Sequence, residues 1–240
     1  MNARGWICAV LAGAALAAPA AARAQAAALR DLPLVEVPVR GEPAGGLIAV
    51  LLTADGGWAT LDRTVAAGLA ADGVPVVGWS SLDYYRRPRT PDAAAADLAR
   101  VLRHYLEAWE GRRVLLVGYS FGADVLPLLV NRLPGDLRAR VAGVALIGLS
   151  PDAVFEFHPS EWVGLVRGRR YPTLSEVRRL GDLPLLCVYG VGDRDEACGR
   201  LGMANARVVA IASGHRMGPV AAAVGAEVRR QARELARPPG

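Results

Sequence analysis

Lysine is missing from this chain of 240 residues, so all 28 of its basic residues are arginines. Against 23 acidic residues they give a formal net charge of +5 at pH 7. A charge this small does not indicate a nucleic-acid-binding protein, and we expect no nucleic-acid partner. The missing lysine and the abundant alanine indicate a compositional bias of the source rather than a functional feature.

Long apolar runs are scarce as well. One covers residues 6–18, between Arg4 and a break at Pro19, and Ala22-Arg23-Ala24 follows shortly after. A basic start, an apolar stretch and an A-x-A site predict a secretory signal peptide over residues 1–24, cleaved after Ala24. The alternative is a membrane anchor, which needs an apolar stretch of roughly 20 residues.

The remainder of the chain shows no internal repeat and no second apolar run of membrane-spanning length. Its length fits one domain of ordinary size with a substantial core. We therefore expect residues 25–240 to form a single domain that is exported to the periplasm.

Cysteine occurs only three times, and Cys8 lies in the predicted signal peptide. Cys187 and Cys198 remain as an even pair in a chain sent to an oxidising compartment. We predict that they form a disulfide; the alternative is two free buried thiols.

Short apolar runs rich in β-branched residues alternate with longer amphipathic segments. Because these runs are apolar nearly throughout, they predict parallel strands that are covered on both faces. The repeated strand and helix order predicts an α/β fold with a doubly wound, mostly parallel sheet. The expected strands are residues 47–53, 74–79, 113–119, 141–148, 183–189 and 207–212, with an edge strand over 35–39; the expected helices are 60–71, 91–109, 121–133, 195–204 and 217–236.

One connection is longer than the others. Residues 149–182 separate two predicted core strands and contain several aromatic residues, with His158 among them. A connection of this length and aromatic content predicts a small lid insertion over a site.

A serine motif stands between a predicted strand and a predicted helix. In Gly118-Tyr119-Ser120-Phe121-Gly122 the glycines allow the tight strand-to-helix turn that presents a serine hydroxyl above a sheet. This G-x-S-x-G motif in this position predicts a nucleophile elbow of the α/β-hydrolase fold, with Ser120 as nucleophile.

A serine nucleophile needs a base and an orienting acid, which follow it in the chain order acid then histidine. His215 lies just after the last predicted strand, where the base belongs, whereas we expect His104 to lie on the surface of a helix. The acid should lie in the loop after the fifth core strand, where Asp193 and Asp195 are both candidates. The predicted disulfide would brace this loop.

The oxyanion hole of such a site uses two backbone N–H groups. One should come from Phe121, the residue after the nucleophile. The other should come from the loop after the first core strand, where the candidates are Gly56, Gly57 and Trp58.

Five groups of residues occur together along nearly the whole chain beyond the predicted signal peptide. In this combination they resemble the bacterial virulence protein family VirJ/AcvB. Ala54 and Ser213 stand where we expect glycines in the family pattern, and neither departure removes a catalytic group. The groups are Asp55-Gly56-Gly57-Trp58; Ser81-Leu82-Asp83-Tyr84-Tyr85 with Arg89-Thr90-Pro91 and Asp97-Leu98; the serine motif with Ala123-Asp124; Leu149-Ser150-Pro151-Asp152-Ala153 with Phe155-Glu156-Phe157-His158; and Cys187-Val188-Tyr189-Gly190 with Asp195 and Cys198.

The resemblance implies a periplasmic serine esterase with links to virulence. We expect no cofactor and no metal. The family includes members that hydrolyse aminoacylated phospholipids, notably lysyl-phosphatidylglycerol. We expect Tyr119, Asp83 and His158 to bind substrate. The substrate's ammonium group would favour nearby carboxylates, although each candidate could instead be a helix cap or a solvated charge. The candidates are Asp83, Asp124, Asp152, Glu156 and Glu161.

Two other functions remain open at this point. One is a non-catalytic periplasmic binding protein associated with a type IV secretion system, and the other is a carboxylesterase or thioesterase of another substrate class. Arginines at positions 167, 169, 170, 178 and 179 could make transient contact with an anionic membrane surface, or could be a solvated surface.

Overall fold

The structure is a computed structural model that describes residues 29–156 and 169–237. Its centre is a seven-stranded sheet in the order β1-β3-β2-β4-β5-β8-β9. All neighbouring pairs are parallel except β1 with β3. The strands are β1 (Leu34–Val37), β2 (Leu47–Leu52), β3 (Val76–Trp79), β4 (Arg113–Tyr119), β5 (Val141–Ile147), β8 (Leu185–Gly190) and β9 (Ala206–Ile211).

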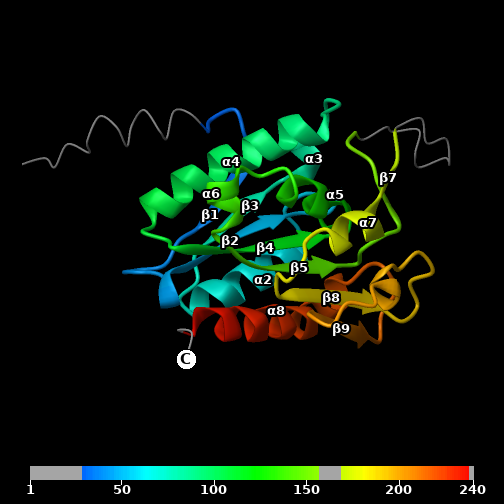
Figure 1. The fold of residues 1–240 in the computed structure, drawn as a ribbon. Coiled ribbons are helices and arrows are strands. Elements are labelled where there is room, and N and C mark those ends of the chain that lie inside the picture. Colours follow the sequence, from blue (N-terminus) through cyan, green and yellow to red (C-terminus); the bar gives the residue numbers. More distant parts are fainter. Residues whose placement is uncertain (1–28, 157–168, 238–240) are drawn as a thin grey trace, which may run out of the picture.

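Helices cover both faces of this sheet. Figure 1 shows α4, α5 and α6 above the sheet and α2 and α8 below it. The longer helices are α2 (Thr60–Ala71), α4 (Pro91–Ala108), α5 (Phe121–Val130) and α8 (Ala221–Ala236), and the short ones are α3 (Ser81–Tyr84), α6 (Gly135–Arg138) and α7 (Thr173–Arg178). Single 3-10 turns are η1 (Ala44–Gly46), η3 (Cys198–Arg200) and η4 (Gly218–Val220).

Strand β2 shows why these apolar runs become buried strands. All of its residues are buried, and successive side chains point to opposite faces of the sheet. Leu47, Ala49 and Leu51 belong to the core between the sheet and helices α2 and α8. Ile48, Val50 and Leu52 belong to the core between the sheet and helices α4 and α5. A strand with an apolar layer on each side must be apolar throughout, so the prediction of a doubly wound, mostly parallel sheet is confirmed.

The predicted helix over residues 195–204 is wrong. Only the turn η3 forms there, and the chain is held close to β8 instead. The Cys187–Cys198 disulfide brings the two Cα atoms to 5.6 Å, and the backbone N–H of Ala197 donates to the carbonyl of Leu149 at 2.8 Å. These two attachments oppose a straight helix leading away from β8. The predicted disulfide is confirmed.

The connection over residues 149–182 contains a two-stranded antiparallel pair and a short helix. The pair is β6 (Asp152–Ala153) with β7 (Tyr171–Pro172), and α7 follows directly. The ring of Phe155 lies 5.4 Å from that of Tyr171, centroid to centroid. His158, Glu161 and Arg167 lie outside the described residues, as does the predicted signal peptide, and the role of this connection as a lid stays a prediction.

Within the described part of the chain, no helix combines the length and apolar character needed to cross a membrane.

Candidate active site

Ser120 lies at the sharp turn between β4 and α5, and it is half-buried. Its φ is 50°, in the left-handed region that few residues other than glycine adopt. The turn is fixed at both sides because the N–H of Ser120 donates to the carbonyl of Ile147 at 2.7 Å, and its carbonyl accepts from the N–H of Asp124 at 3.0 Å. Strain of this kind persists where the surrounding structure holds it, often at functional sites.

The two glycines of the serine motif are required by close backbone contacts. A Cβ atom at Gly118 would lie 2.5 Å from the carbonyl oxygen of Gly122, and one at Gly122 would lie 2.3 Å from the carbonyl oxygen of Leu52. Both distances are far below van der Waals contact, so any larger residue would push α5 away from β2 and β4. Glycine therefore allows the turn that exposes the hydroxyl.

Three side chains from separate loops form one hydrogen-bonded chain. The Oγ atom of Ser120 lies 2.7 Å from Nε2 of His215. On the other side of the imidazole, Nδ1 lies 2.7 Å from Oδ2 of Asp193. The Asp193 side chain is only 6 % exposed, whereas the His215 side chain is 39 % exposed. The carboxylate is thus enclosed while the imidazole can reach a ligand.

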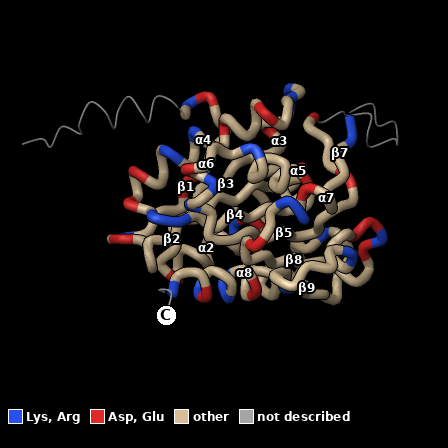
Figure 2. Tube along the Cα trace, viewed as in Figure 1, with Lys and Arg blue, Asp and Glu red and all other residues tan. Residues whose placement is uncertain are grey.

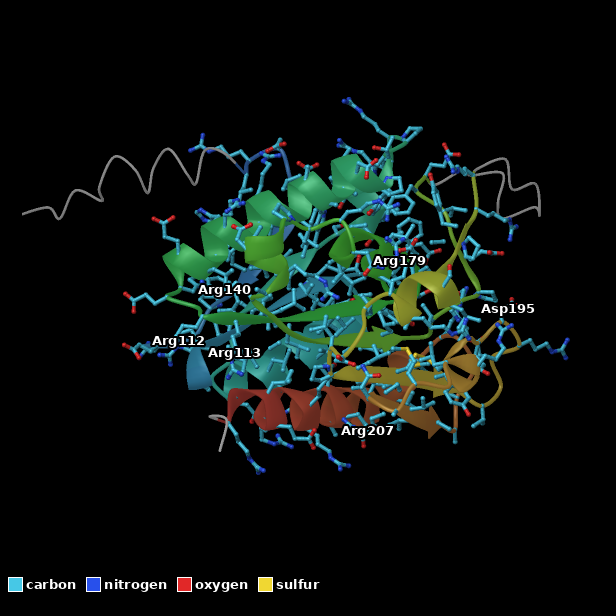
Figure 3. The ribbon with its side chains drawn as sticks, viewed as in Figure 1. Arg112, Arg113, Arg140, Arg179, Asp195 and Arg207 are labelled. Atoms are coloured by element: carbon cyan, nitrogen blue, oxygen red, sulfur yellow. A yellow bond between two sulfur atoms is a disulfide. The ribbon has the colours of Figure 1, made fainter. Side chains whose placement is uncertain are left out.

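Asp195, the other candidate acid, does not contact His215. It is exposed in the loop after β8, and Figure 3 places it at the outer edge of the molecule. Its backbone N–H donates to Oδ1 of Asp193 at 3.1 Å. The backbone at position 195 therefore helps to orient the Asp193 carboxylate, while the Asp195 side chain faces solvent.

The loop that carries His215 is attached to the serine turn. The hydroxyl of Tyr119 accepts a hydrogen bond from the backbone N–H of Met217 at 3.2 Å. Burial raises the pKa of Tyr119 above its ordinary value, so the side chain stays a neutral phenol. Tyr119 was predicted to bind substrate, and the structure places its hydroxyl against the backbone next to the histidine.

A further glycine lies beside the imidazole. Gly148 follows β5 with φ 65°, and a Cβ atom there would lie 3.5 Å from Cε1 of His215. Gly148 was predicted to end a strand, and its contact with the imidazole was not recognised. The sequence signal for this contact was a glycine at the carboxyl end of a predicted core strand, the end at which the serine turn also lies.

The loop after β2 is a tight turn. The N–H of Gly57 donates to the carbonyl of Ala54 at 3.1 Å, and Gly57 has φ 69°. Gly56 is exposed, and a Cβ atom there would meet nothing within 4 Å. The ring of Trp58 packs directly on Gly78 of β3: a Cβ atom at Gly78 would lie 2.2 Å from Cζ3 of Trp58.

Thr53 anchors this turn, and sequence reasoning missed it. It is fully buried, its hydroxyl donates to the carbonyl of Ala54 at 2.9 Å, and the hydroxyl oxygen accepts from the N–H of Ser81 at 2.9 Å.

Phe121, the other predicted contributor of an oxyanion-hole N–H, is the first residue of α5. Its N–H therefore lies at the positive end of that helix dipole.

Asp83, a predicted substrate-binding residue, takes part in local contacts of α3. Its carboxylate accepts from the hydroxyl of Ser80 at 2.8 Å, and Ser80 in turn caps the N–H of Asp83. Arg86 pairs with the same carboxylate at 3.1 Å. The third predicted substrate-binding residue, His158, lies outside the described residues, and His104 is half-buried on α4.

The remaining candidate carboxylates differ in their surroundings. Burial raises the pKa of Asp124 well above its usual range, and nearby Asp193 and Asp152 add to this effect. Its Oδ1 accepts from the N–H of Ser150 at 2.7 Å, so the carboxyl holds the segment after β5. Asp152 pairs with Arg170 at 3.4 Å, and Glu156 is half-buried.

The described arginines of the predicted membrane-contact set also have partners in the protein. Arg169 stacks over the ring of Tyr171 at 5.0 Å, Arg178 donates to the carbonyl of Arg200 at 3.2 Å, and Arg179 pairs with Glu176 at 3.0 Å. Across residues 29–156 and 169–237, no three His, Cys, Asp or Glu side chains gather in a way that could hold a metal ion.

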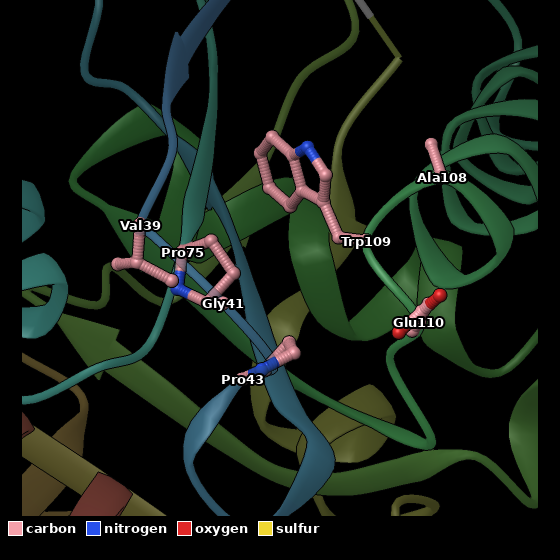
Figure 4. Close-up of a pocket in the computed structure, with 7 residues that line it drawn as sticks. All are labelled: Val39, Gly41, Pro43, Pro75, Ala108, Trp109 and Glu110. Atoms are coloured by element: carbon pink, nitrogen blue, oxygen red, sulfur yellow. The ribbon is translucent and has the colours of Figure 1, made fainter.

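A separate small pocket of about 200 Å³ lies at the amino ends of the parallel strands, lined by residues that include Pro75, Trp109 and Glu110 (Figure 4). Ser120 follows the carboxyl end of β4, so this pocket and Ser120 lie at opposite ends of the parallel strands.

Solved structures with similar folds are α/β hydrolases. The esterase domain of a Rhodothermus marinus protein is 19% identical, with a TM-score of 0.60, covering 84% of this chain and 91% of that chain. A thioesterase domain from the curacin biosynthetic pathway is 16% identical, with a TM-score of 0.55, covering 81% and 93%. An α/β serine hydrolase homologue from Coxiella burnetii is 14% identical, with a TM-score of 0.56, covering 82% and 90%. The predicted α/β-hydrolase fold is confirmed.

No curated protein matches this chain. The sequence model of a family described as bacterial virulence protein (VirJ) matches residues 46–234, which include the serine turn, the acid loop and His215. This range covers most of the chain and agrees with the resemblance found in the sequence. The chain belongs to the bacterial virulence protein (VirJ) family.

Proposed function

We propose that this protein is a serine hydrolase that cleaves carboxylic esters. The observation that carries the proposal is the hydrogen-bonded chain from Ser120 through His215 to Asp193, with 2.7 Å at each link. A catalytic triad is recognised by geometry of this kind, independently of where its three residues stand in the sequence.

In the proposed reaction, Nε2 of His215 accepts the proton of the Ser120 hydroxyl as Oγ attacks the ester carbonyl. The resulting imidazolium gives that proton to the departing alcohol, which leaves an acyl group on Ser120. Water then attacks the acyl group with His215 again as base, the imidazolium returns that proton to Oγ of Ser120 as the acyl–oxygen bond breaks, and the carboxylic acid departs. Asp193 holds Nδ1–H throughout and stabilises the imidazolium, because its enclosed carboxylate is 2.7 Å away.

The negative charge on the carbonyl oxygen needs N–H donors during both steps. We assign one to Phe121, at the amino end of α5, and the other to the turn after β2. The N–H of Gly57 already donates to Ala54 within that turn, so a donor from this loop would come from another position, with Gly56 among the candidates.

We further propose an aminoacylated phospholipid such as lysyl-phosphatidylglycerol as substrate. The family match and the resemblance of the motifs support this choice, and the ester of such a lipid suits the proposed chemistry. The same reasoning places the protein in the periplasm, with residues 1–24 as a cleaved signal peptide and a role in virulence. The buried disulfide between Cys187 and Cys198 fits an oxidising compartment.

Other functions predict different results. A carboxylesterase or thioesterase of another substrate class would use the same three side chains, and an esterase domain and a thioesterase domain are among the similar structures. A non-catalytic periplasmic protein associated with a type IV secretion system would not need Ser120 and His215 in contact.

The test is hydrolysis of lysyl-phosphatidylglycerol by the purified protein and by its Ser120→Ala variant. We expect the release of lysine to fall by at least about 10³-fold in the variant, with the far-ultraviolet circular dichroism unchanged. Turnover that survives the substitution would refute Ser120 as nucleophile. Activity toward simple esters but not toward the lipid would refute the substrate and leave the serine mechanism in place.

A further inference from the structure

A groove of about 380 Å³ separates the start of the described chain from the loop after α3. Residues 30–33 form one wall, and residues between Asp83 and Arg89 form the other. Four arginines border this groove, which we call the arginine groove: Arg30, Arg86, Arg87 and Arg89.

The two carboxylates of the arginine groove are already paired. Asp31 accepts hydrogen bonds from Nη1 and Nη2 of Arg100 at 3.0 and 2.8 Å, and this contact lowers the pKa of Asp31. Asp83 pairs with Arg86 and with the hydroxyl of Ser80. Arg100 and Arg86 are the direct partners of these carboxylates, and Arg89 also contributes to the lowered pKa of Asp31 without pairing with it.

Three of the arginines keep their charge available. Arg30, Arg87 and Arg89 make no ion pair within residues 29–156 and 169–237. Three guanidinium groups without a direct ion-pair partner around one concavity repel each other, and an anion between them would relieve that repulsion.

Arg89 is held in place before any ligand binds. Its guanidinium carbon lies 4.5 Å from the centre of the Tyr84 ring, a cation–π contact. Its Nε is buried with no hydrogen-bond partner, so the two Nη groups are the ones that can meet a ligand. Its backbone N–H donates to the carbonyl of Phe155 at 3.0 Å, which fixes the loop against the segment after β6. A guanidinium fixed in this way loses little conformational entropy on binding.

The arginine groove and Ser120 lie at the same edge of the sheet. Helix α3 follows the carboxyl end of β3, as Ser120 follows that of β4. Aromatic rings connect the two places: Tyr84 lies 4.8 Å from Tyr85, and Tyr85 lies 4.8 Å from Phe121, centroid to centroid. Figure 2 shows basic positions at the tip of the loop after α3, which projects from this edge.

We propose that the arginine groove binds a phosphate group. Guanidinium groups are planar and offer paired N–H donors that match phosphate oxygens. The anionic headgroups of a phospholipid bilayer would supply this group at high density, and binding them would turn the edge that carries Ser120 toward the membrane. A free phosphate ester carries the same chemistry, and the two sources can be separated by experiment.

The experiment compares two double variants that lose the same charge. Arg87→Gln with Arg89→Gln removes two arginines of the groove. Arg40→Gln with Arg237→Gln removes two exposed arginines near the opposite edge of the sheet. Both are made in the Ser120→Ala protein, so that binding is measured without turnover and is independent of the proposed reaction, and thermal unfolding verifies that each variant folds. The single variant Arg87→Gln, at an exposed position, serves as a second groove variant if the loss of the Arg89 contact with Tyr84 disturbs folding.

Partition onto vesicles of phosphatidylcholine with phosphatidylglycerol is measured by co-sedimentation, and binding of inorganic phosphate is measured by calorimetry. We expect the groove variant to lose vesicle binding roughly 25-fold, about fivefold for each arginine, and the control variant to lose less than about threefold. Phosphate binding that is sensitive to the groove variant, without vesicle binding, would assign the groove to a free phosphate ester. Equal losses in both double variants, or no binding of either probe, would overturn the proposal.

Discussion

The hydroxyl of Tyr119 and the backbone N–H of Met217 are joined by a hydrogen bond of 3.2 Å across 98 positions of sequence. Tyr119 precedes the proposed nucleophile, and Met217 follows the proposed base by two residues. This contact therefore connects the two segments that must stay in register for the Ser120 to His215 hydrogen bond to form.

Removing that hydroxyl should weaken catalysis more than binding. In Tyr119→Phe the ring keeps its packing, but the N–H of Met217 loses its acceptor, which costs about 1 to 2 kcal/mol. We expect kcat to fall by about 5- to 30-fold, with KM for a soluble ester little changed. Tyr189→Phe is the control, because the hydroxyl of Tyr189 makes no hydrogen bond in the described residues. Equal effects of the two substitutions would argue against a role for this contact.

The two acidic residues of the loop after β8 should differ sharply. Asp193→Asn leaves Nδ1 of His215 without its carboxylate and favours the wrong tautomer, so we expect kcat to fall by about 10³- to 10⁴-fold. Asp195→Asn changes an exposed side chain whose backbone N–H is retained, and we expect a change of less than about threefold. Steady-state kinetics on one ester would measure both, and a larger loss in the Asp195 variant would contradict the assignment.

The serine motif can also be tested through stability. A methyl group at Gly122 would lie 2.3 Å from the carbonyl oxygen of Leu52, so Gly122→Ala should lower the free energy of unfolding by more than about 3 kcal/mol. Gly135→Ala is the control, since a methyl group there meets nothing within 4 Å, and we expect a change within about 0.5 kcal/mol. Urea unfolding of the two variants would give both values. An unaffected Gly122 variant would show that the turn can open without cost.

Stability should depend on pH through Asp62, which is fully buried at the start of α2. Its Oδ2 accepts from the N–H of Ala59, its Oδ1 has no partner, and burial raises its pKa from 3.8 to about 6. Between these values the folded state binds more protons than the unfolded state, so the contribution of Asp62 to stability falls as pH rises from about 4 to 6. The loss is at most about 3 kcal/mol.

Asp62→Asn remains neutral at every pH and can still accept from Ala59. The difference in unfolding free energy between the original protein and this variant should therefore shift in favour of the variant as pH rises from 4 to 7. A difference that is constant over this range would mean that Asp62 does not titrate with a raised pKa. Chemical denaturation at four pH values would measure it.

The local pattern of residues in the sequence was sufficient to predict much of the fold. The buried strands were recognisable because a strand covered on both faces has to be apolar at every position, as in β2. The serine turn was recognisable because its glycines are demanded by contacts within a few residues and with the neighbouring strand. Ser120 and His215 were found from such positions, at the ends of strands that the sequence already predicted.

The helix expected over residues 195–204 shows where local pattern failed. Nothing in that segment alone indicates that Ala197 and Cys198 are held against Leu149 and Cys187. The attachments are long-range, and they override a helical preference worth only a few tenths of a kcal/mol per residue.

The sequence by itself determined the sheet, the serine turn and the histidine that serves it, since each depends on neighbours in the chain. Only the tertiary structure decided that Asp193 rather than Asp195 meets the imidazole, and that Tyr119 holds the histidine loop. The direction of a side chain on a turn, and the meeting of residues 98 positions apart, depend on how separate strands place their loops at one edge of the sheet.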